Sequence, residues 1–134
     1  MDIGTRIDTF LEAPVFAVVG ASRDRSKYGN KVLRCYLKNN RSAHPINPRG
    51  GDIEGLPAYP SLQAVPDPVE SVSLITPPHV TETIVEDAHQ AGVQNLWMQP
   101  GAESPAAIQR AEELGLNFIA DGSCLLVVLG FKGP

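Results

Sequence analysis

The alternation of two hydrophobic patterns constrains the fold of this chain more than any other feature. Short apolar runs, beginning with Val15–Val19, are separated by segments such as Tyr28–Asn39, whose apolar residues recur at every third or fourth position. Strands buried on both faces of a sheet have continuous apolar runs, whereas apolar residues at every third or fourth position indicate amphipathic helices. The alternation therefore predicts an α/β fold, with a parallel sheet of about five strands and helices on both faces.

Turn and capping residues place the boundaries of the expected elements. The crossover Ile53–Pro68 holds four prolines, so we expect extended chain with a single helical turn there. Ser104 followed by Pro105 is typical of a helix start, and we expect that helix to run to Leu114. The other expected elements are a short N-terminal helix containing Ile3, Ile7, Phe10 and Leu11, strands at Ala43–Ile46, Ser71–Ile75, Leu96–Met98 and Asn117–Ala120, a helix from Val80 to Ala91, and a frayed end at Lys132–Pro134.

The length and composition indicate one ordinary globular domain over residues 1–134. Apolar residues make up 43% and charged residues 19% of the chain, which is not the composition of a disordered segment. A net charge of −4 argues against nucleic acid or an anionic membrane surface as a partner. No apolar stretch approaches the ~20 residues that span a bilayer, and Met1–Gly4 does not begin a signal peptide, so we expect a cytoplasmic protein.

Four loops with strong turn chemistry each follow an expected strand, at Gly20–Arg23, Asn47–Arg49, Thr76–Pro78 and Gln99–Ala102. In a parallel sheet the carboxyl ends of all strands lie at one edge, which is where open α/β sheets bind ligands. The four loops are therefore expected to line one crevice. The candidate ligand-binding residues are Gly20, Ala21, Ser22, Arg23, Lys27, Tyr28, Arg41, Asn47, Pro48, Arg49, Thr76, Pro77, Pro78, Gln99 and Gly101.

The turn that begins at Gly20 has the character of a phosphate-binding site. Unpaired N–H groups at a helix N-terminus, together with the positive end of the helix dipole, favour a diphosphate. Ser22 could bond such a phosphate or merely cap the following helix.

The residues around this turn argue against NAD as the ligand. The G-x-G-x-x-G fingerprint is absent, and the second strand ends in Asn47–Arg49 where NAD-binding domains carry an acid for the ribose. An arginine at that place suits a ribose phosphate, which NADP carries at the 2′ position and coenzyme A (CoA) at the 3′ position. The cations expected around the crevice are Arg23, Arg25, Lys27, Arg41 and Arg49. A multiply phosphorylated small molecule is the expected partner.

Taken in order, Val-Val-Gly-Ala-Ser-Arg, Asn-Pro, Thr-Pro-Pro and Gln-Pro-Gly-Ala resemble the CoA-binding domain family of small stand-alone Rossmann-like proteins. The resemblance runs from about Phe10 to Cys124 and extends to the amino-terminal domain of the succinyl-CoA synthetase alpha subunit. It implies a Rossmann-like fold that holds CoA through Gly20–Arg23, Arg41 and Thr76–Pro78. It does not imply ligase activity, because the phosphorylated histidine of the synthetase belongs to a second domain.

No catalytic or metal-binding set can be assembled from the remaining reactive residues. The histidines and the two cysteines, Cys35 and Cys124, lack the spacing of a zinc site or a disulfide framework. Cys124 follows the last strand near the crevice and could exchange with the CoA thiol, but we interpret it as a small buried residue. His79 we interpret as solvent-facing and Trp97 as core.

The expected function is therefore binding of CoA or an acyl-CoA without catalysis. Two alternatives remain open: an NADP-dependent oxidoreductase that acts as an oligomer, and a protein-interaction or sensor subunit with a vestigial nucleotide site. A homo-oligomer is compatible with each of them.

Overall fold

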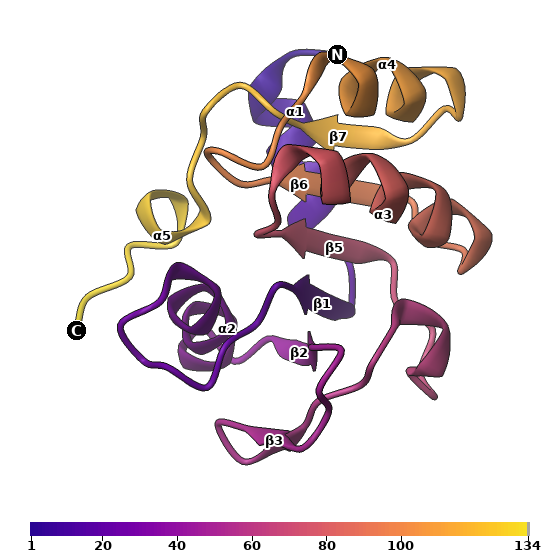
Figure 1. Cartoon of the computed structure of the whole chain (residues 1–134). Helices are drawn as coiled ribbons and strands as arrows, with labels where there is room; N and C mark the ends of the chain where they lie inside the picture. The colour runs from indigo at the N-terminus through magenta and orange to yellow at the C-terminus, as the bar shows by residue number, and fades with distance from the viewer. Residues whose placement is uncertain (134) are drawn as a thin grey trace.

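A five-stranded parallel sheet forms the centre of the computed structural model, which describes residues 1–133 (Figure 1). The strands lie in the order β2-β1-β5-β6-β7, and every neighbouring pair is parallel. Their bounds are β1 Val15–Val19, β2 Ser42–Ile46, β5 Ser71–Leu74, β6 Asn95–Met98 and β7 Asn117–Ile119. The predicted Rossmann-like α/β architecture is confirmed.

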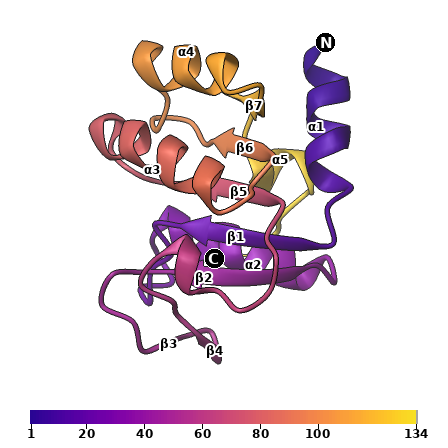
Figure 2. The same ribbon diagram turned by 90° about the vertical axis from the view of Figure 1, so that its right-hand side faces the viewer.

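Helices cover both faces of this sheet, as the alternation predicted (Figure 2). The helices are α1 Ile3–Leu11, α2 Tyr28–Lys38, α3 Pro78–Gln90, α4 Pro105–Glu113 and α5 Leu125–Val128, with a 3-10 turn η1 at Leu62–Ala64. One core cluster joins α1, α2 and α5 to one face of the sheet through side chains such as Phe10, Tyr36 and Trp97. A second cluster joins α3, α4 and η1 to the opposite face through Val85, Leu96 and others. The expectation that Trp97 is a core residue is confirmed, since it is fully buried.

The register of the sheet brings the carboxyl ends of its first strands level with one another. Val19 at the end of β1 pairs with Ile46 of β2 on one side and with Leu74 of β5 on the other. Leu74 in turn pairs with Met98 of β6. The loops that leave these strands consequently start side by side at one edge.

The chain changes direction across the sheet between β1 and β5. From β1 it steps through α2 to β2 at one side, and the crossover after β2 then returns past β1 to β5 at the other side. Connections from neighbouring strands that leave in opposite directions open a crevice between them, the usual ligand position in such sheets.

Two parts of the chain differ from the expectation. The crossover contains the expected helical turn η1, but also a small antiparallel hairpin of β3 (Asp52–Ile53) and β4 (Leu56–Pro57). Glu54 and Gly55 form its two-residue turn with φ of 51° and 79°, which is the geometry of a tight hairpin. The apolar stretch after Cys124 forms the additional short helix α5.

Two further observations concern the C-terminal end and the length of the helices. Fraying at Lys132–Pro134 stays a prediction, and Pro134 lies outside the described residues. Within residues 1–133, no helix has the length and apolar character needed to cross a membrane.

Candidate functional site

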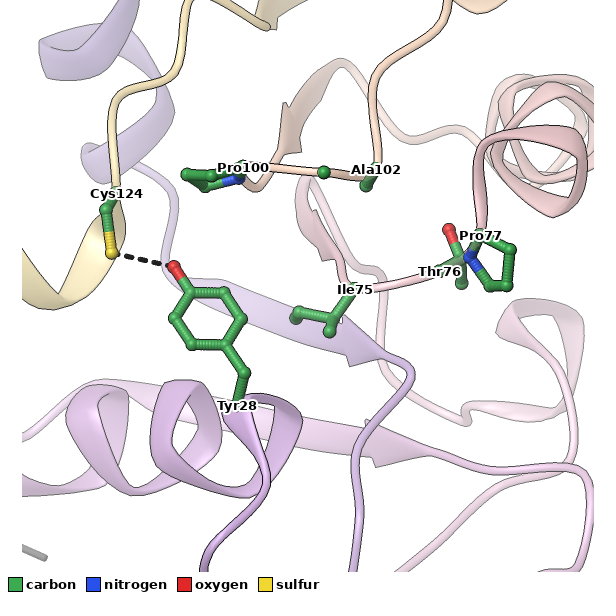
Figure 3. A pocket seen from close by; sticks show the side chains of 8 residues that line it. Tyr28, Ile75, Thr76, Pro77, Pro100, Ala102 and Cys124 are labelled. Atoms are coloured by element: carbon green, nitrogen blue, oxygen red, sulfur yellow. Dashed lines mark hydrogen bonds between the residues drawn. The ribbon is translucent and has the colours of Figure 1, made fainter.

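Two cavities lie at the carboxyl edge of the sheet and meet at Thr76, which lines both of them. The larger cavity, of about 520 Å³, is lined by Tyr28, Ile75, Thr76, Pro77, Pro100, Gly101, Ala102 and Cys124 (Figure 3). The smaller cavity, of about 200 Å³, is lined by Val19, Gly20, Ile46, Pro48, Pro60, Ser61, Leu62, Thr76, Val80, Ile84 and Asp87. Together they flank the crevice between β1 and β5.

The glycine turn after β1, residues 20–23, requires glycine at its first position. Gly20 has a φ of 95°, and a Cβ built on it would overlap the backbone carbonyl of Ile75. A Cβ on Gly29, in the first turn of α2, would likewise overlap the carbonyl oxygen of Gly20. The turn therefore lies in backbone contact with the residue that follows β5 on one side and with α2 on the other.

Asparagine side chains hold the carbonyl groups of this turn. The Asn47 Nδ2 donates to the Ala21 carbonyl at 3.0 Å, and the Asn30 Nδ2 donates to the Ser22 carbonyl at 2.9 Å. By contrast, the backbone N–H groups of Ala21, Ser22 and Arg23 have no hydrogen-bond acceptor within residues 1–133. The turn thus presents unpaired donors beside a helix N-terminus, an arrangement that suits an anion.

The β3–β4 hairpin and the loop after β2 are fastened to the glycine turn. The Arg23 guanidinium donates to the Gly50 carbonyl, and Arg25 forms an ion pair with Glu54 at 3.4 Å. Glu54 also accepts from Asn30 at 3.1 Å. These contacts join the glycine turn and α2 to residues of the loop and hairpin that are far from Gly20 in sequence.

A chain of hydrogen bonds runs from the core to the wall of the larger cavity. The fully buried Gln99 donates from Nε2 to Ser73 at 3.3 Å, and its Oε1 accepts from the Tyr28 hydroxyl at 3.0 Å. The Tyr28 oxygen lies 2.7 Å from the Cys124 sulfur (Figure 3). Burial is the main cause that raises the pKa of Tyr28 above its usual value, and the Cys124 contact adds to it. The Tyr28 hydroxyl is therefore neutral at physiological pH.

Most predicted site residues lie in the loops at this edge, but they have different surroundings. Those that line a cavity are Gly20, Tyr28, Pro48, Thr76, Pro77 and Gly101. Gln99 lies behind the wall and supports Tyr28. The side chains of Lys27 and Arg49 are exposed and form no hydrogen bond or ion pair with a described residue.

The expectation that Arg41 belongs to the crevice is wrong. Arg41 precedes β2, so it lies at the amino edge of the sheet, opposite the cavities. Its guanidinium donates to the Leu11 carbonyl at 2.7 Å and lies 5.6 Å from the centre of the Phe16 ring. Arg41 ties α1 to the sheet.

The interpretation of Cys124 as a buried packing residue is also wrong. It is partly exposed and lines the larger cavity, whereas Cys35 is fully buried in the core. Gly29 and Asn30 were missed altogether, and only the i, i+9 spacing of Gly20 and Gly29 hinted at the close helix approach.

Comparison with known proteins places this chain in a family. The family model of the CoA binding domain matches residues 15–130. The ADP-forming acetate–CoA ligase I of Archaeoglobus fulgidus is 26% identical over 98 residues, which are 73% of this chain and 14% of the ligase. The chain therefore spans a small part of that relative.

Two solved structures cover nearly the same length as this chain. A conserved hypothetical protein from Pyrococcus furiosus has 36% identity and a TM-score of 0.79, over 84% of this chain and 97% of that chain. A hypothetical protein from Pyrococcus horikoshii OT3 has 28% identity and a TM-score of 0.88, over 95% and 89% of the respective chains. Since the family model extends over almost the whole sheet and both cavities, this chain belongs to the CoA-binding domain family.

Proposed function

We propose that residues 1–134 act as one unit that binds CoA or an acyl-CoA at the carboxyl edge of the sheet, without catalysing a reaction of the ligand. The observation that carries the proposal is the glycine turn, whose N–H groups at Ala21, Ser22 and Arg23 have no acceptor in the described chain. Three free donors in a turn that packs against the first turn of α2 suit the diphosphate of CoA. Family membership supports CoA as the nucleotide.

The two cavities suit the two ends of such a ligand. The smaller cavity has apolar walls at Val19, Ile46 and Val80 and lies beside Gly20, which fits the flat adenine base. The larger cavity is walled by Pro77, Pro100 and other apolar groups, which fits the uncharged pantetheine arm. The diphosphate then lies between them at the turn.

The exposed Arg49 is the group best placed to read the 3′-phosphate. It follows β2 in the loop whose Pro48 lines the smaller cavity, and its guanidinium has no partner among the described residues. A free guanidinium can bind a phosphate with two parallel hydrogen bonds. The NADP-dependent alternative has no support in the family match, which is to a CoA-binding domain.

Calorimetric titration of the full chain with CoA, acetyl-CoA, dephospho-CoA and NADPH tests the proposal. We expect saturable binding of CoA and acetyl-CoA, weaker binding of dephospho-CoA, and the weakest binding of NADPH. Thermal unfolding provides the independent readout, because a ligand of the folded state raises the melting temperature with the logarithm of its concentration. Failure of millimolar CoA to bind or to raise the melting temperature would refute the proposal.

A further inference from the structure

Cys124 is the reactive group on the wall of the larger cavity. Its sulfur lies 2.7 Å from the Tyr28 hydroxyl oxygen, and both side chains line that cavity (Figure 3). The other cysteine, Cys35, is fully buried on α2 and lines neither cavity described above. The structure thus separates one accessible thiol from one that is enclosed in the core.

The hydrogen bonds around Tyr28 can accommodate Cys124 both as a thiol and as a thiolate. Gln99 Oε1 accepts from the backbone N–H of Leu125 at 3.0 Å and from Tyr28 at 3.0 Å, which identifies this oxygen as an acceptor. When Cys124 is a thiol, its S–H donates to Tyr28 and the Tyr28 O–H donates to Gln99. When Cys124 is a thiolate, the single Tyr28 proton can turn to the sulfur and stabilise its charge.

Tyr28 keeps this proton over the pH range in which thiols ionise. Burial raises the pKa of its hydroxyl above the usual value, so it does not become a second anion beside the sulfur. The deprotonated thiol is the species that attacks disulfides, so a fixed neutral donor next to it favours exchange.

The position of Cys124 relative to the glycine turn matches the construction of CoA. The thiol of CoA is at the far end of the pantetheine arm from the diphosphate. Thr76 lines both cavities, so an arm anchored at the turn can pass Thr76 into the larger cavity. Ile75, Pro100 and Ala102 supply apolar walls there, and Cys124 lies on the same cavity.

We propose that Cys124 captures CoA as a mixed disulfide in the larger cavity, with Tyr28 as the residue that positions and stabilises its thiolate. This inference rests on the proposed function and adds a covalent step to it. The co-reactant is a disulfide of CoA. The Cys124 sulfur attacks one sulfur of that disulfide, the S–S bond breaks, and a Cys124–CoA disulfide forms. The second CoA leaves as a thiolate and takes up the proton lost from Cys124, so atoms and electrons balance.

Intact-mass measurement of the full chain after incubation with CoA disulfide tests this step. We expect a gain of one CoA per chain that dithiothreitol reverses, and peptide mapping without reductant places it on the peptide with Cys124. Cys124→Ser loses the adduct, with thermal unfolding to check its fold. Cys35→Ala keeps the adduct and is the matched control.

Glutathione disulfide provides the comparison that separates site-directed capture from ordinary thiol reactivity. Reaction with CoA disulfide should be faster by roughly tenfold or more, because nucleotide binding brings the disulfide to the thiol. Equal rates with both disulfides, or an adduct mapped to Cys35, would overturn the inference.

Tyr28→Phe tests the positioning role through a readout that loss of packing does not move. The variant lacks the O–H that can donate to the Cys124 sulfur, so we expect the pH–rate profile to shift to higher pH and the rate at neutral pH to fall several-fold. An unchanged profile would remove Tyr28 from the step.

The outcomes for the two proposals are distinguishable. Reversible binding of CoA without any adduct overturns the capture by Cys124 and leaves the proposed function in place. Absence of both reversible binding and the adduct overturns the two together.

Discussion

At the scale of single residues, position relative to the sheet decides what a side chain can do. Arg41 and Arg49 are the same residue type, eight positions apart, on either side of β2. Arg41 precedes the strand and is engaged by Leu11 and Phe16, whereas Arg49 follows the strand and has no partner among residues 1–133. Of these two arginines, only Arg49 is available to a ligand at the carboxyl edge.

Replacement of Arg49 by alanine is therefore expected to weaken CoA selectively. Loss of a charged hydrogen bond to the 3′-phosphate should cost about 1.5–3 kcal/mol of binding free energy, with little change for dephospho-CoA. Calorimetric titration with both ligands measures the difference. Arg41→Ala removes the same charge from the opposite edge and should lower the melting temperature without changing either affinity. Equal losses for both ligands in Arg49→Ala would contradict the assigned role.

At the scale of elements, the unit formed by β1, the glycine turn and α2 depends on backbone contact. Gly29 lies in α2, where a Cβ would overlap the Gly20 carbonyl oxygen, so the helix can approach the strand only without a side chain there. That approach directs the N-terminus of α2 at the turn. Asn30, next along the helix, then reaches the Ser22 carbonyl.

Two glycine-to-alanine substitutions in helices should consequently have opposite effects. Intrinsic helix propensity favours alanine over glycine by about 1 kcal/mol. At Gly4 of α1 a Cβ would meet only the Asp2 side chain at 3.4 Å, so Gly4→Ala should stabilise the chain or leave it unchanged. Gly29→Ala should instead destabilise it by roughly 1–3 kcal/mol, because backbone must move, and should weaken CoA binding.

Urea unfolding of the two variants, together with CoA titration, measures these effects. A Gly29→Ala protein as stable as the Gly4→Ala protein would show that α2 can shift without cost. In that case the close approach would not be needed to form the turn.

At the scale of the whole molecule, two apolar clusters on opposite faces hold the sheet, and one of them encloses ionisable groups. Tyr36 and Cys35 are fully buried beside each other, and the Tyr36 hydroxyl contacts Ser73 at 2.6 Å. Burial raises the pKa of Cys35 from 9.0 to about 11 and also raises the pKa of Tyr36. Both groups remain protonated in the folded state at a pH where the unfolded chain loses those protons.

The folded chain should therefore become less stable as the pH rises above 9. The unfolded state binds fewer protons there, so the free energy of unfolding falls with pH, by on the order of 2 kcal/mol for Cys35 between pH 9 and 11. The loss from Tyr36 begins near pH 10, the usual value for a tyrosine. Urea unfolding from pH 8 to pH 11 measures the decline. Cys35→Ala should remove the part that begins at pH 9 and leave the later part; an identical decline in both proteins would refute the assignment.

Prediction from the sequence was most successful where local pattern and tertiary structure depend on the same physical cause. The apolar runs form strands because both of their faces are covered. The segments with apolar residues at every third or fourth position form helices because one face of each is buried. Pro105 and Ser104 started α4 as expected, with the Ser104 hydroxyl accepting from the Ala107 N–H at 3.0 Å. The four strand-end loops met at one edge because parallel strands leave no other arrangement.

The errors arose where residues distant in sequence determine the environment. The expectation for Arg41 rests on its charge and on the family resemblance. The expected strand Ala43–Ile46 already puts Arg41 before β2, at the opposite edge of the sheet from the four loops. The β3–β4 hairpin was missed because two-residue strands carry almost no periodicity.

The sequence by itself determined the α/β class, the edge at which the four loops meet and the glycine turn, since these follow from local hydrophobic periodicity and from backbone freedom at one residue. Only the tertiary structure decided which side chains share the crevice. It placed Cys124 against Tyr28, 96 positions away, and Asn47 against the Ala21 carbonyl. Such contacts depend on how the sheet and helices pack, and no local pattern encodes them.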